Sequence, residues 1–98
     1  MPTTPKTIGT TAVQLVERRN DRTVLEIVNL SDTATIYISD TVKETLDTTK
    51  GLPIHPGGSR IIQLSDWDFG ALHEWWGVSD TANTNIIIYE SFMEGGNE

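Results

Sequence analysis

Apolar and polar residues alternate along most of this chain, and polar turns interrupt the alternation every few residues. Apolar side chains share one face in three early runs: Val13 with Leu15, Leu25 with Ile27, and Ala34 with Ile36 and Ile38. A period of two is typical of β-strands that bury one face. No window of helical length carries the i, i+3, i+4, i+7 stripe of an amphipathic helix. The sequence therefore predicts an all-β fold.

Six strands are expected from this pattern, in the ranges 12–16, 23–30, 34–39, 60–64, 72–79 and 85–92. These runs are rich in β-branched and aromatic residues, which favour strands over helices. With allowance for further short strands, we expect six to eight in a single small β-sandwich or barrel. The pattern does not distinguish a jelly-roll topology from an immunoglobulin-like one.

The connections have recognisable turn chemistry. Asn20-Asp21 fits a hairpin turn, and the string Ser-Asp-Thr-Ala occurs at both 31–34 and 79–82, where hydroxyl and carboxylate oxygens can accept backbone N–H groups. Residues 40–50 are expected to form a loop with at most one short helix. The segment 51–59 holds two prolines and three glycines. It is expected at an edge or in a connection, because proline cannot donate to a sheet ladder.

The 98 residues suffice for one domain. Residues 1–10 contain two prolines and little apolar periodicity, so they are expected to form an extended or flexible arm. The sandwich is expected over 11–92, followed by a flexible tail at 93–98. An apolar fraction of 37% supports only a thin core, which would gain stability from self-association or a partner.

Composition argues against several classes of function. The formal net charge of −7 opposes direct binding to a nucleic-acid backbone. The longest apolar run, at 86–89, is far shorter than a membrane helix, so no membrane partner is expected. The chain has no cysteine, which excludes disulfides and thiol chemistry.

Candidates for catalysis are few. His55 and His73 are the two histidines, and neither accompanies a recognisable nucleophile, so we expect no enzyme activity, no metal and no cofactor. Asp66 and Asp68 bring two carboxylates together, but they lack the spacing and glycine of a calcium loop. A cupin-like enzyme that binds metal through both histidines and a carboxylate stays open as a third hypothesis.

Aromatic residues cluster late in the chain. Trp67, Trp75 and Trp76 fall within ten residues, together with Phe69. Strand alternation places Trp75 and Trp76 on opposite faces, so one of them at most can belong to a core layer. The cluster can be core, a protein interface or a platform that stacks on sugar rings. All three tryptophans are therefore candidate partner-binding residues.

Two further groups are candidates for contact with a partner. Arg18, Arg19 and Arg22 are grouped in an otherwise acidic chain, and arginine forks bind carboxylates on a neighbouring surface. A solvated turn is the other interpretation of the same residues, and the sequence favours it slightly. Pro2 and Pro5 lie in the expected arm, which could order along a neighbouring molecule.

The order of features resembles a known group of proteins. The strand Arg22-Thr23-Val24-Leu25-Glu26-Ile27-Val28-Asn29 leads to Ile36-Tyr37-Ile38-Ser39, then to the turn-rich Gly51-Leu52-Pro53-Ile54-His55-Pro56-Gly57-Gly58-Ser59. A Trp-Gly-Val-Ser-Asp-Thr-Ala segment and an aliphatic strand with Tyr89 and Glu90 follow. Over residues 12–92 this resembles the small β-sandwich virion proteins of tailed bacteriophages, such as capsid decoration and head or tail accessory proteins.

The resemblance implies a structural role in a virion that is assembled in the host cytoplasm. Its expected partner is the major capsid protein or another virion protein, and the expected state is a homo-oligomer, with a trimer favoured. The most specific expectation is a capsid decoration or stabilising protein. The alternative is a carbohydrate-binding module or another tail or fibre accessory module.

Overall fold

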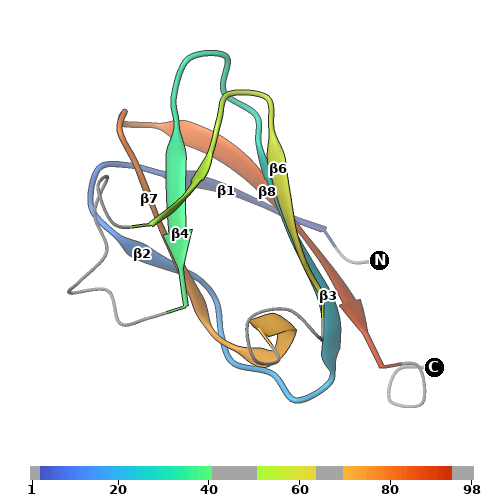
Figure 1. The fold of residues 1–98 in the computed structure, drawn as a ribbon. Coiled ribbons are helices and arrows are strands. Elements are labelled where there is room, and N and C mark those ends of the chain that lie inside the picture. Colours follow the sequence, from blue (N-terminus) through green and yellow to red (C-terminus); the bar gives the residue numbers. More distant parts are fainter. Residues whose placement is uncertain (1–2, 41–50, 64–69, 94–98) are drawn as a thin grey trace.

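In a computed structural model the chain forms two four-stranded antiparallel sheets packed face to face (Figure 1). The structure describes residues 3–40, 51–63 and 70–93. One sheet has the order β1-β8-β3-β6, and the other has the order β2-β7-β4-β5. The strands are β1 Thr3–Ile8, β2 Val13–Val16, β3 Arg22–Asn29, β4 Ile36–Ser39, β5 Leu52–Ile54, β6 Ser59–Gln63, β7 Trp75–Ser79 and β8 Thr84–Phe92.

The pairing order is that of a jelly roll. The first strand pairs with the eighth, the second with the seventh, the third with the sixth and the fourth with the fifth. Two further pairings, β3 with β8 and β4 with β7, join these pairs into the two sheets. The all-β sandwich expected from the sequence is confirmed, and the strand order selects the jelly roll over the immunoglobulin-like alternative.

The core lies between the sheets and is almost entirely aliphatic, with one tryptophan. The alternating positions predicted to face inward are buried, as Leu25, Ile27, Ile36 and Ile38 are all fully enclosed. The buried cluster consists of Ile8, Leu15, Leu25, Ile27, Ile36, Ile38, Ile54, Ile62, Trp75, Ile86 and Ile88. Ala34, also predicted inward, is 1% exposed. Alternation therefore assigned the inward faces of these strands correctly.

The N-terminal segment differs from the sequence expectation. Residues 3–8 were assigned to an extended or flexible arm, but they form β1, which pairs with β8 along its whole length. Ile8 at its end is 3% exposed and belongs to the core. The sandwich therefore begins at Thr3 instead of residue 11. Only one side chain of β1 is fully buried, so an apolar period could not reveal it.

Two other local expectations are corrected. Asn20 and Asp21 do not form a hairpin turn, because β2 and β3 belong to different sheets and their connection crosses between the sheets. Residues 70–72 form a short 3-10 helix, η2, so the strand expected from residue 72 starts at Trp75. The proline-containing β5 lies at a sheet edge, as its composition predicted. The expected loop at 41–50 lies outside the described residues.

The repeated Ser-Asp-Thr-Ala string is turn chemistry, as predicted. Ser31 Oγ accepts the N–H groups of Thr33 and Ala34, and Ser79 Oγ accepts the N–H of Thr81. The two turns also contact each other, since Asp80 accepts the N–H of Thr35 through its carboxylate and donates its own N–H to the Thr35 carbonyl. The string thus fastens two loops at the same end of the sandwich.

A buried asparagine holds that same end together. Asn29 is fully enclosed, and its Nδ2 lies 2.8 Å from the carbonyl oxygen of Ala34 and 3.0 Å from that of Ile54. Its Oδ1 accepts the N–H of Ser31. Each buried side-chain polar atom among the described residues has a hydrogen-bond partner. Buried polar groups here are therefore satisfied and stabilise the connections instead of leaving an unpaired donor or acceptor.

Candidate functional site

The outward surface of the β1-β8-β3-β6 sheet is the most distinctive face of the molecule. Strand register places Pro5 beside Ile87 and Ile87 beside Val28 in one row across three strands. A second row joins Tyr89, Glu26 and Ile61. We define the outer apolar face as the apolar side chains of these two rows together with two residues near the ends of β3, Val24 and Leu30. Its members are Pro5, Val24, Val28, Leu30, Ile61, Ile87 and Tyr89.

The outer apolar face is poorly covered by the rest of the chain. Leu30 and Ile61 are each 50% exposed, whereas aliphatic residues of the core are 7% exposed or less. Among the described outward positions of the four strands, Glu26 carries the one formal charge. In a chain with a net charge of −7, such a neutral face is conspicuous. Contiguous exposed apolar surface on a small soluble domain is typical of an interaction site.

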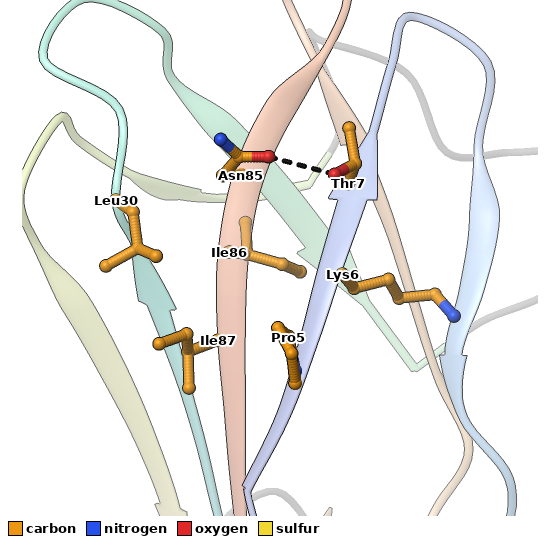
Figure 2. A pocket seen from close by; sticks show the side chains of 7 residues that line it. All are labelled: Pro5, Lys6, Thr7, Leu30, Asn85, Ile86 and Ile87. Carbon is orange, nitrogen blue, oxygen red and sulfur yellow. Dashed lines mark hydrogen bonds between the residues drawn. The ribbon is translucent and has the colours of Figure 1, made fainter.

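A groove of about 340 Å³ opens on this face between β1, β8 and the end of β3 (Figure 2). Pro5, Ile87 and Leu30 line it from three neighbouring segments. At one end the Thr7 hydroxyl donates to Asn85 Oδ1 at 2.9 Å, so polar groups close the groove there. The groove can accept an apolar side chain from a partner, with hydrogen-bonding groups at its rim.

The three arginines are separated by the fold. Arg18 and Arg19 are exposed in the connection between β2 and β3. Arg19 is bound to its own neighbours, because its guanidinium pairs with Asp21 at 3.0 Å and lies 4.1 Å from the centre of the Phe92 ring. Arg22 is 1% exposed. The grouping in sequence therefore does not give a cluster of arginine forks at the surface.

Arg22 is a structural residue, and its assignment as a partner-binding residue is corrected. Its Nε donates to Glu90 at 3.0 Å, and its two terminal nitrogens donate to the carbonyl oxygens of Ala71, His73 and Glu17. Burial lowers the pKa of Arg22 below its ordinary value, and the nearby Glu90 carboxylate opposes that change. The guanidinium fastens η2 and the end of β2 to the first sheet.

The tryptophans are also separated. Trp75 is 1% exposed and its indole N–H donates to the Gly70 carbonyl at 2.8 Å, so it is a core residue and offers no surface to a partner. Trp76 lies on the opposite face of β7, as alternation predicted, and is partly exposed. Its indole N–H donates to Glu74, which also accepts from Gln14. Trp67 lies outside the described residues.

The two prolines proposed as partner-binding residues also have different outcomes. Pro5 is exposed at the centre of β1 and lines the groove, so it stays a candidate contact residue, although it belongs to a strand and not to an arm. Pro2 lies outside the described residues. Of the candidate residues that the structure describes, Pro5 alone belongs to the outer apolar face.

The histidines do not form a joint site. His73 Nδ1 lies 2.9 Å from Asp40 Oδ2, with both side chains about 30% exposed. His55 is exposed in the turn after β5. Within residues 3–40, 51–63 and 70–93, no group of three His, Cys, Asp or Glu side chains is arranged to hold a metal ion. Asp66 and Asp68 lie outside these ranges.

Alternation assigned the inward residues of β3 and β4 correctly, but it left open which of Trp75 and Trp76 is core and did not follow the outward residues. Val24 and Val28 alternate with Leu25 and Ile27, so a period of two directs them to the opposite face, and their apolar character was the available signal. Ile61 and Ile87 sit within continuous aliphatic runs, in which an outward residue cannot be told from an inward one by period alone. Only the register across four strands brings these residues into one surface.

Comparison with known proteins adds no relative: no protein-family model, curated protein or solved structure matches the chain. Among the described residues, none belongs to a helix long and apolar enough to cross a membrane.

Proposed function

We propose that this protein is a virion structural protein, most specifically a capsid decoration or stabilising protein that binds the major capsid protein lattice. The observation that carries the proposal is the outer apolar face, a sheet surface that leaves Leu30 and Ile61 half exposed and has few charges, on an acidic domain. A surface of this kind gains free energy when a partner buries it.

Two further points support the proposal. The order of features along residues 12–92 resembles small phage virion proteins, and the jelly roll is an architecture used by viral capsid and lectin domains. The second point is an argument from fold analogy, which is weaker than an argument from a site. The binding role is therefore assigned to the outer apolar face and not to the fold as such.

The test is co-sedimentation of the purified full chain with assembled particles of the proposed partner, the major capsid protein of the same phage. Leu30→Lys adds a charge at a half-exposed position of the expected contact, so we expect binding to weaken by about tenfold or more. Thr11→Lys adds the same charge at an exposed position in the β1–β2 connection and should bind as the unmodified protein does. Equal binding by both variants, or no binding by the unmodified chain, would contradict the proposal.

A carbohydrate-binding function is the second candidate, and Trp76 is the observation that favours it. The ring is partly exposed on the outer surface of β7, and its bond to Glu74 fixes its orientation. A fixed aromatic ring is suited to stacking on a sugar. Glycan-array binding that disappears on Trp76→Ala would support this function, and an array without signal would exclude it for the glycans displayed.

A further inference from the structure

Glu26 lies among apolar side chains on the outer surface of the β1-β8-β3-β6 sheet. Its two neighbours in sequence are enclosed in the core, so its own side chain points outward from β3. Tyr89 is its register partner on β8, and Ile61 is its register partner on β6. Val24 and Val28 flank it along β3 on the same face. Members of the outer apolar face therefore surround this carboxylate both along the strand and across it.

The Glu26 carboxylate has no counter-charge in the part of the chain that the structure describes. No hydrogen bond or ion pair joins it to any residue within 3–40, 51–63 or 70–93. Its side chain is partly exposed, so water solvates the charge in the isolated chain. Burying a carboxylate without a counter-charge is unfavourable, because the hydration that is lost is not replaced. A partner that covers the outer apolar face must therefore supply a cation at Glu26.

Tyr89 favours arginine over lysine as that cation. It lies directly across from Glu26 in the register of β3 and β8, and residues opposed in this way have Cβ atoms about 4.5–5.5 Å apart. A guanidinium is planar, so it can form two parallel hydrogen bonds with a carboxylate and can also stack on an aromatic ring. The lysine ammonium is a compact and strongly hydrated charge. An arginine can thus contact both side chains at once.

The groove on the same face is placed to take an apolar side chain of the same partner (Figure 2). Ile87 lines the groove and is the register partner of Val28, which lies two residues along β3 from Glu26. Offsets of about 6.8 Å along the strand and about 4.8 Å across it give roughly 8 Å between the positions of Glu26 and Ile87. Residues two apart in an extended segment lie on one side of it, about 7 Å from each other. One extended segment can therefore reach Glu26 and the groove together.

We propose that the outer apolar face binds a partner protein through an arginine that pairs with Glu26 and stacks on Tyr89, while an apolar side chain two residues away enters the groove. The proposal rests on the proposed function in that it uses the same face, and it adds the chemistry of the partner. The net charge of −7 supports it, because an acidic domain attracts a basic surface and accelerates the encounter.

The probe for this site is the peptide acetyl-Thr-Leu-Thr-Arg-Thr-amide, titrated into the isotope-labelled full chain and followed by NMR. We expect saturable amide shifts at Glu26, Ile87 and Tyr89, with a dissociation constant of about 1 mM. Replacing the arginine of the peptide by glutamine should raise the dissociation constant about threefold or more, the effect of a partly exposed ion pair. Replacing its leucine by alanine should raise the dissociation constant as well, because the groove then stays unfilled.

Substitution of Glu26 tests whether the arginine pairs with this carboxylate. Glu26→Gln keeps the size of the side chain and removes its charge, so the dissociation constant of the arginine peptide should rise about threefold or more. On this variant the glutamine peptide should bind as well as the arginine peptide, since the pair is already lost. Glu17→Gln removes the same charge at an exposed position in the β2–β3 connection, and it should bind as the unmodified chain does.

Several results would overturn the proposal. These are no saturable shift up to about 10 mM peptide, equal affinity of the unmodified chain for the arginine and glutamine peptides, no effect of replacing the leucine, or equal losses from Glu26→Gln and Glu17→Gln. Self-association of the full chain that Glu26→Gln and Arg18→Gln both abolish would also overturn it. The exposed Arg18 of a second copy would then be the cation that occupies the face.

Capsid co-sedimentation separates this inference from the proposed function. Where the unmodified chain binds capsids, Glu26→Gln should weaken binding by about tenfold or more, because a full interface excludes water from the pair. Equal binding by Glu26→Gln would remove the inference and keep the proposed function. Peptide binding at Glu26 by a chain that does not sediment with capsids would keep the inference and remove the proposed function.

Discussion

At the residue scale, two arginines three positions apart have opposite roles. Arg19 is half exposed and pairs with Asp21, whereas the enclosed Arg22 joins a carboxylate and three backbone carbonyls. From residue type alone, both arginines were predicted to belong to one group at the protein surface. What separates them is position relative to the start of β3, where Arg22 enters the space between the sheets and is desolvated. A buried guanidinium is tolerated there because each of its three nitrogens donates to at least one acceptor.

Substitution of Arg22 should therefore be costly. Arg22→Met keeps much of the apolar stem but leaves Glu90 and three carbonyl oxygens unpaired, so we expect the free energy of unfolding to fall by about 3–5 kcal/mol. Arg19→Met removes an exposed pair and should cost under about 1 kcal/mol. Urea unfolding followed by tryptophan fluorescence measures both. Equal losses for the two variants would show that the buried network does not stabilise the fold.

At the element scale, strands with a clear alternation were predictable, and the strands missed are two edge strands that contain proline. β3 and β4 alternate cleanly, and their inward residues were assigned from the sequence. β1 and β5 are edge strands that contain proline, and each has a single fully buried residue, Ile8 and Ile54. An edge strand needs only one ladder and little burial, so its sequence carries little period.

The status of β1 is open to a direct test. Ile8→Ala removes a side chain that is 3% exposed in the core, so we expect the free energy of unfolding to fall by about 2–4 kcal/mol. Thr3→Ala, at the exposed start of the same strand, should change it by less than about 0.5 kcal/mol. If residues 1–10 were a free arm, Ile8→Ala would be as silent as Thr3→Ala in chemical denaturation.

At the scale of the whole molecule, the jelly roll is built from pairings between distant parts of the chain. Thr3 pairs with Tyr89, and Val24 pairs with both Gln63 and Ser91. Closing such loops costs chain entropy before the contacts can repay it. The topology therefore predicts slow folding for a chain of this size.

We expect refolding from urea in about milliseconds to seconds at 25 °C, the range of all-β domains with non-local pairing. Stopped-flow fluorescence of the buried Trp75 reports the formation of the core. Refolding completed within the instrument dead time, with no slower phase, would contradict a transition state that depends on long-range strand pairing. The measurement is made at low protein concentration, so that self-association does not contribute.

The sequence by itself determined the all-β class, the inward faces of the main strands and the turn chemistry of the Ser-Asp-Thr-Ala strings. These follow from backbone preferences and a period of two, which act between near neighbours. Only the tertiary structure decided which strand pairs with which, which of Trp75 and Trp76 is core, and that Arg22 is enclosed. Alternation predicts which side chains lie on the same face of a strand, but it does not predict which other parts of the chain cover that face. The outer apolar face exists because four strands distant in sequence are brought into register.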